Sequence, residues 1–154
     1  MLQLLPAPAD VLLRDGEAQL ILRLDSVARL AGRVAVDSDG ALLATLPITA
    51  HVVRISPAGE MSEFGRRGSA PGRFGVPMGI AVDRDGKILV SDVLRCVILV
   101  FSKDFKFLRE FGTRSFKPEG LIAPGDLLAD AGGRVYISQL RKRGVSVFQV
   151  GPTE

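Results

Sequence analysis

Histidine and cysteine are almost absent from this sequence of 154 residues. His51 is the only histidine and Cys96 the only cysteine. One cysteine cannot form an internal disulfide, and one histidine with one cysteine cannot supply the usual ligand sets for zinc or the usual nucleophile-and-base pairs. The sequence therefore predicts no catalytic residue, no metal ligand and no cofactor in this chain.

Long apolar runs and tryptophan are also missing. No stretch is long enough to cross a membrane as a helix, so we expect no membrane partner. Residues 1–11 are apolar, but they are short, lack a basic start and contain two prolines, which makes them a poor signal peptide. If Met1 is the native start, the expected location is the cytoplasm. Aromatic residues make up only 6% of the chain, so the core must be built mainly from aliphatic side chains.

What the sequence does contain is glycine and proline, in numbers that indicate frequent turns. Seventeen glycines and nine prolines are spread along the chain, and 47% of the residues are hydrophobic. Short apolar runs separated by turn residues are typical of an all-β protein. The net charge of +3 is modest and permits an acidic partner without requiring one.

An internal repeat organises the chain. Three segments share an apolar run followed by aspartate and a turn, namely residues 34–40, 80–86 and 127–133. Their aspartates, Asp37, Asp83 and Asp130, are 46 and 47 residues apart. A Phe-Gly pair at residues 64–65 recurs 47 residues later at 111–112. Two independent markers with nearly the same period indicate one repeated structural unit.

Each repeat is interpreted as four short antiparallel strands. In the second repeat we expect strands at residues 80–82, 87–92, 97–101 and 105–111. The Asp-Gly pairs predict tight hairpins in which Gly40 and Gly86 take positive φ angles. Four such strands in about 45 residues have the size of one β-propeller blade.

The second repeat resembles the NHL repeat, a family of propeller blades. The resemblance rests on residues 72–74, 77–83, 86–92 and 97–101, and in weaker form it covers about residues 10–150. It implies blades of a propeller that usually has six. The chain departs from the family pattern where Arg33 and Asp126 replace the glycine found at Gly79.

The predicted domain organisation is a single segment of about three blades. Two closing strands of a split blade occupy residues 10–24, whole blades occupy 31–65 and 77–112, and a blade without its fourth strand occupies 124–150. Two copies would make six blades, so we expect a homodimer that closes the ring. In that ring, residues 18–24 of each copy would complete the last blade of the other.

Three kinds of residue in the repeats invite a functional interpretation. The recurring aspartates could form a ring of calcium ligands, although aspartate at this position more commonly caps the turn. His51 could be a ligand, but a lone histidine is more commonly a surface residue. Cys96, beside an arginine, could be reactive, but it fits a partly buried structural position better.

Basic residues occur in the connections before the second and third blades and in the turns between second and third strands. In a propeller these segments emerge on one face. The candidate ligand-binding residues are Arg66, Arg67, Arg73, Arg95, Arg114, Lys117, Arg141, Lys142 and Arg143. Such a face could bind a protein or a polyanion, including RNA, as some NHL proteins do; alternatively, these are simply solvated loops. Phe74 and Phe116 are the only obvious aromatics available for stacking on bases.

The sequence thus favours a non-catalytic binding or scaffold module. One alternative is a propeller hydrolase or lyase whose site is completed by a second chain. The other is a fragment of a longer propeller.

Overall fold

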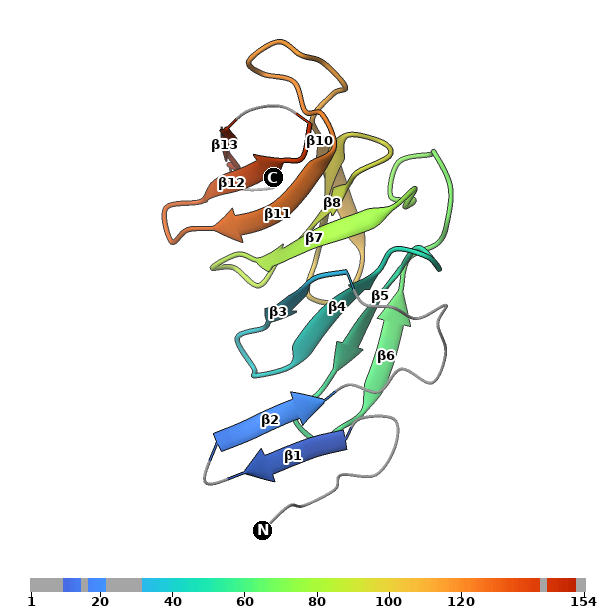
Figure 1. Cartoon of the computed structure of the whole chain (residues 1–154), viewed down its shortest axis with the longest axis vertical. Coiled ribbons are helices and arrows are strands. Elements are labelled where there is room, and N and C mark those ends of the chain that lie inside the picture. The colour runs from blue at the N-terminus through green and yellow to red at the C-terminus, as the bar shows by residue number, and fades with distance from the viewer. Residues whose placement is uncertain (1–9, 15–16, 22–31, 142–143, 152–154) are drawn as a thin grey trace.

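Turns that contain glycine divide the chain into short strands. The computed structural model describes residues 10–14, 17–21, 32–141 and 144–151, and within them it contains strands and no helix (Figure 1). No helix long and apolar enough to span a membrane is found in these residues. The expected all-β fold is confirmed.

The strands form three antiparallel sheets and one hairpin, stacked along the molecule in chain order (Figure 1). The hairpin consists of β1 (Asp10–Arg14) and β2 (Glu17–Ile21). The first sheet consists of β3 (Val34–Val36), β4 (Leu42–Leu46), β5 (His51–Ile55) and β6 (Met61–Phe64). The second consists of β7 (Pro77–Val82), β8 (Ile88–Asp92), β9 (Val97–Phe101) and β10 (Phe107–Phe111). The third consists of β11 (Pro124–Ala129), β12 (Arg134–Gln139) and β13 (Val145–Gln149).

Two predicted strand boundaries in the second sheet are wrong, each for a local reason. β7 begins at Pro77 rather than residue 80, because a register shift between Pro77 and Ile80 lets the strand continue through the irregularity. β10 begins at Phe107 rather than residue 105, because Phe105 takes a φ of 65° inside the preceding turn. The predicted closing strand at 18–24 corresponds to β2, and residues 22–24 lie outside the described part.

The hairpin turns are built as the sequence predicts. Gly40 and Gly86 have φ angles of 81° and 79°, which confirms their positive-φ placement. Asp83 Oδ1 accepts hydrogen bonds from the backbone N–H groups of Asp85 and Lys87 at 2.9 and 2.8 Å. The repeated aspartate therefore caps the turn that follows its strand.

Two of the three buried clusters lie between the stacked sheets, and the third, around Ala44 and Val53, lies on the other side of the first sheet. Leu43, Val52 and Phe74 pack with Ile88 and Leu99 between the first and second sheets, and all are buried. A separate cluster between the second and third sheets includes Leu89, Cys96, Ile98, Leu121 and Ile137. Cys96 is buried, as expected for a structural cysteine. His51 is the first residue of β5 and is half-buried.

Candidate ligand-binding face

The antiparallel topology sends every loop to one of two opposite ends of the sheets. Turns joining first to second and third to fourth strands lie at one end, which we call the hairpin face; it includes residues 37–41, 83–87 and 102–106. Turns joining second to third strands, and the connections between sheets, lie at the other end, which we call the connection face. It includes residues 65–76, 93–96 and 112–123.

The predicted basic residues that the structure describes lie on the connection face, but they differ in accessibility. Arg73 is half-buried, the Arg95 side chain is 12% exposed, and Lys142 and Arg143 lie outside the described residues. The exposed members are Arg66, Arg67, Arg114, Lys117 and Arg141.

Arg67 and Arg114 occupy equivalent positions in the two connections and make equivalent contacts. The Arg67 guanidinium donates to the carbonyl oxygen of Ile48, and that of Arg114 donates to the carbonyl oxygen of Leu94. Both acceptors lie in the turn between second and third strands of the preceding sheet. Each arginine therefore ties a connection to a neighbouring turn while remaining exposed on the face.

Arg95 is engaged within the chain. Its guanidinium forms a bidentate ion pair with Glu110, with distances of 2.6 and 2.9 Å, and also donates to the carbonyl oxygen of Arg73 at 2.7 Å. Paired guanidinium and carboxylate groups balance each other's charge. Arg95 therefore positions the connection more than it offers charge to a ligand.

Two side chains hold the connections in place, and neither was singled out from the sequence. The buried carboxylate of Asp92 accepts from the backbone N–H groups of Gly75 and Val76 at 2.5 and 3.1 Å. Its repeat equivalent, Gln139, accepts from the N–H of Ile122 at 2.6 Å. These bonds fix the backbone on which the exposed arginines stand.

A groove of about 410 Å³ opens on the connection face between the second and third sheets. Arg114 and Arg141 both line it, although they are distant in sequence. Leu94, Ile122 and Leu140 contribute apolar lining. The groove therefore combines two cations with apolar walls.

The hairpin face carries charges of both signs. Lys87 lies 3.8 Å from Asp83 and 3.2 Å from Asp85, and Arg134 lies 2.9 Å from Asp130. The backbone N–H of Arg134 and the Tyr136 hydroxyl donate hydrogen bonds to the Asp130 carboxylate, which lower its pKa. Asp83, Asp85 and Asp130 on this face thus have neighbouring cations, whereas several exposed arginines lie on the connection face.

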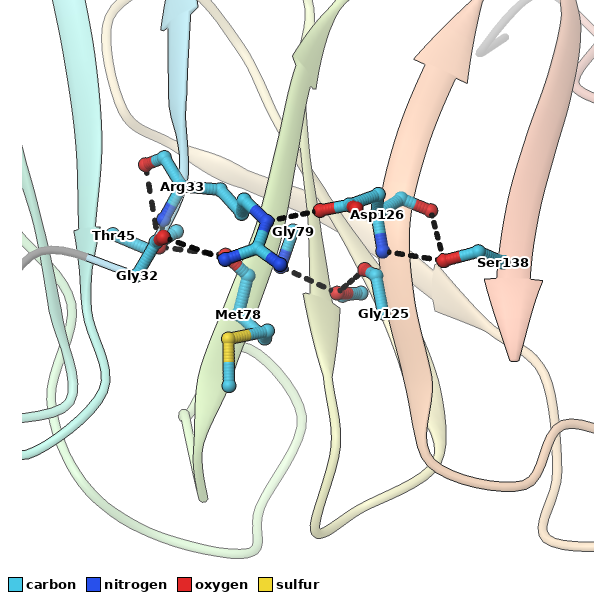
Figure 2. A network of polar contacts seen from close by, with 9 residues as sticks. Gly32, Arg33, Thr45, Met78, Gly79, Gly125, Asp126 and Ser138 are labelled. Carbon is cyan, nitrogen blue, oxygen red and sulfur yellow. Dashed lines mark hydrogen bonds and ion pairs between the residues drawn. The ribbon is translucent and has the colours of Figure 1, made fainter. Parts of the chain in front are cut away.

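A side-chain hydroxyl group at one position of the repeat joins each sheet to the next (Figure 2). This position was not singled out from the sequence. Thr45 Oγ1 accepts from the N–H of Arg33 at 2.9 Å and donates to the carbonyl of Met78 at 2.6 Å. Ser91 Oγ repeats this pattern between Gly79 N–H and the carbonyl of Gly125, at 2.7 and 2.6 Å. A hydroxyl residue at one position of every repeat was the available signal.

Arg33 and Asp126 also meet across the second sheet. Figure 2 shows the guanidinium of Arg33 passing over Met78 and Gly79 to form an ion pair with the Asp126 carboxylate. These residues occupy the same repeat position as Gly79, which has no side chain to block them. The departures from the NHL pattern noted in the sequence thus form a complementary pair.

Solved structures similar to this one are β-propeller proteins. Virginiamycin B lyase from Staphylococcus aureus matches with a TM-score of 0.60 and 17% identity, over 94% of this chain and 49% of that chain. A streptogramin B lyase matches with a TM-score of 0.63 and 15% identity, over 94% and 48%. A chain of a nidogen–laminin complex matches with a TM-score of 0.62 and 19% identity, over 90% and 52%.

The fold is therefore that of consecutive β-propeller blades. The chain spans about half the length of the structures it matches. No family model and no curated protein sequence matches it.

Proposed function

We propose that this chain is a non-catalytic binding module of a β-propeller, whose connection face recognises an acidic protein segment. The observation that carries the proposal is the groove between the second and third sheets, where Arg114 and Arg141 flank apolar walls. Arginine guanidinium groups bind carboxylates through well-oriented hydrogen bonds. The apolar lining fits the aliphatic side chains of a peptide that carries those carboxylates.

The aromatic residues favour a protein partner over single-stranded RNA. Recognition of unpaired bases relies on stacking against exposed aromatic rings. Phe74 is completely buried in the core, so it offers no such surface. Phe116, which is 78% exposed, is the aromatic that the connections present to solvent. A single exposed ring on a face whose groove has apolar walls suits a peptide better than a run of bases.

The repeats are proposed to be of the NHL type. The period of 46 and 47 residues, the Asp-Gly hairpins and the Phe-Gly pairs that begin each connection support this assignment. In the structure, Gly65 and Gly112 follow equivalent strands, and a Cβ on either would lie within 2.6 Å of the buried side chain of Phe74 or Leu121. Close packing against these buried side chains therefore explains why glycine recurs at this position of the repeat.

A lyase or hydrolase function is the alternative that the comparisons raise. Three of the matched structures are lyases, at 15% to 18% identity. A likeness at that level is one of fold, and enzymes and binding proteins share folds freely. The groove supplies cations and apolar surface, which support binding more directly than catalysis.

The test compares binding of a labelled peptide of alternating glutamate and leucine with that of a poly-uridine RNA. Arg141→Glu should weaken peptide binding by about tenfold or more, because it reverses a charge that lines the groove. Lys103→Glu, an equal charge change on the hairpin face, should leave binding within about twofold. RNA binding stronger than peptide binding, or equal effects of the two variants, would contradict the proposal.

A further inference from the structure

The hydroxyl that joins each sheet to the next has an unused counterpart on the third sheet. Ser138 is the repeat equivalent of Thr45 and Ser91, and its Oγ accepts from the N–H of Asp126 at 2.8 Å, as the pattern requires. Its other contact is the carbonyl of that same residue at 3.5 Å, the outer limit for a hydrogen bond. Thr45 and Ser91 each reach the carbonyl of a following sheet at 2.6 Å, and Ser138 makes no such hydrogen bond within the part of the chain that the structure describes.

The matching acceptor lies at the other end of the stack. Gly32 is the repeat equivalent of Met78 and Gly125, whose carbonyls accept from the hydroxyls of Thr45 and Ser91. The Gly32 carbonyl accepts from the guanidinium of its neighbour Arg33 at 3.0 Å, and a carbonyl oxygen has a second lone pair. The third sheet therefore carries the hydroxyl donor, Ser138, and the first sheet carries the equivalent carbonyl acceptor, Gly32.

Apolar side chains repeat this relationship. Ile98 and Val100 of β9 are 0% and 1% exposed against the third sheet, whereas their equivalents on β13, Val145 and Val147, are 60% and 53% exposed. With Leu128 of β11, they form what we call the open third face.

The first sheet shows the complementary surface. Ile80 of β7 is 4% exposed against the first sheet, and its equivalent on β3, Val34, is 58% exposed. Val34 and Val36 of β3, with Gly32, form what we call the open first face, which is limited to the β3 edge of the sheet. Farther along the same side, Ala44 of β4 and Val53 of β5 are already buried within the chain. Exposed apolar patches of this kind mark interaction surfaces.

The charges at the inner edges of the two faces are opposite. Asp126 stands beside the open third face and Arg33 beside the open first face, and their side chains are 58% and 51% exposed. If one face stacked on the other, the Asp126 carboxylate would lie next to the Arg33 guanidinium, because the two residues occupy the same repeat position.

From these three relationships we infer that the open third face binds the open first face of a second copy of this chain. In that junction Ser138 Oγ donates to the Gly32 carbonyl of the second copy, and Asp126 pairs with the second copy's Arg33. Two identical junctions close a ring with two-fold symmetry. The propellers that match the chain are about twice its length, as a ring of two copies requires. The inference concerns assembly and does not depend on the proposed acidic partner.

The first test is the mass of the protein in solution, measured by light scattering at micromolar concentration. We expect twice the chain mass of 16.5 kDa. Val147→Glu, on the open third face, should give the monomer. Ile48→Glu is the matched control, because Ile48 is similarly exposed, at 51%, but lies in a turn of the connection face. A monomeric parent, or a Val147→Glu variant that remains dimeric, would overturn the inference.

A second test distinguishes contacts between copies from contacts within one copy. Arg33→Glu and Asp126→Arg each place like charges at both junctions of a homodimer. In a mixed dimer of the two variants, one junction pairs the original residues and the other pairs the exchanged residues, while the contacts within each copy stay repulsive. The mixture should therefore dimerise about tenfold more tightly than either variant alone. Equal dimerisation of the mixture and the separate variants would contradict the assigned pairing.

Discussion

Arg95 and Glu110 form a two-point ion pair that joins the turn before β9 to β10, with distances of 2.6 and 2.9 Å. The same guanidinium donates to the carbonyl of Arg73, so one side chain connects the second sheet to the connection that precedes it. Arg95 was predicted from the sequence to bind a ligand, but in the structure its contacts stabilise the backbone of the connection face.

Glu110→Gln should destabilise the protein by about 1–2 kcal/mol. The change removes the charge that Arg95 pairs with, at a site where both side chains are largely buried but still reached by solvent. Urea unfolding measures the loss. The exposed Glu63 gives the matched control, and Glu63→Gln should change stability by less than about 0.5 kcal/mol. Equal effects at the two positions would show that the ion pair contributes nothing specific.

Asp92→Asn should cost about 1–3 kcal/mol. Both carboxylate oxygens of Asp92 accept from backbone N–H groups, so the amide nitrogen of asparagine would face a donor instead of an acceptor. Amide hydrogen exchange should speed up first at Gly75 and Val76. Asp104→Asn, at an exposed turn of the hairpin face, is the control. Unchanged exchange at Gly75 would contradict the role given to Asp92.

Gly86→Val should destabilise the protein by about 1 kcal/mol or more. Gly86 has a φ of 79°, and a Cβ there would meet only Lys103 at 3.9 Å, so the cost is backbone strain rather than crowding. Gly86→Asn should cost clearly less, because asparagine tolerates this conformation. Thermal unfolding of both variants measures the two losses of stability. Equal losses for Gly86→Val and Gly86→Asn would contradict the assignment of the cost to backbone strain.

The contribution of Asp130 to stability should depend on pH. Hydrogen bonds, chiefly from the backbone N–H of Arg134, lower the pKa of Asp130 below its usual value of 3.8. A carboxyl whose pKa is lower in the folded state stabilises the protein above its unfolded-state pKa, and this contribution disappears as the pH falls through the folded-state value. The stability difference between the parent and Asp130→Asn should therefore be larger at pH 7 than at pH 3. A difference that stays constant with pH would contradict this assignment.

The strands and their turns could be predicted from the sequence because the repeat is local. Short apolar runs and the Asp-Gly pairs predict β8 and β9 to within one residue at each end. The start of β10 was missed because Phe105 adopts a positive φ, a conformation that its type gives no reason to expect.

The contacts between sheets were largely beyond sequence reasoning. Arg33 and Asp126 are 93 residues apart and meet only because the sheets stack closely and Gly79 leaves space between them. The placement of the basic residues on one face followed from blade topology alone. Which of them remain exposed depended on partners such as Glu110, whose pairing with Arg95 is set by the register of β10 on β9.

If the connection face rather than the hairpin face binds an acidic protein segment, the glutamate–leucine peptide should protect backbone amides on that face alone. Amide hydrogen exchange, measured with and without the peptide, reports this protection. We expect slower exchange at residues 93–96 and 112–123, which contribute Leu94, Arg114 and Ile122 to the groove, and unchanged exchange at residues 37–41 and 83–87. Protection confined to the hairpin face, or an absence of protection at a saturating peptide concentration, would contradict the claim.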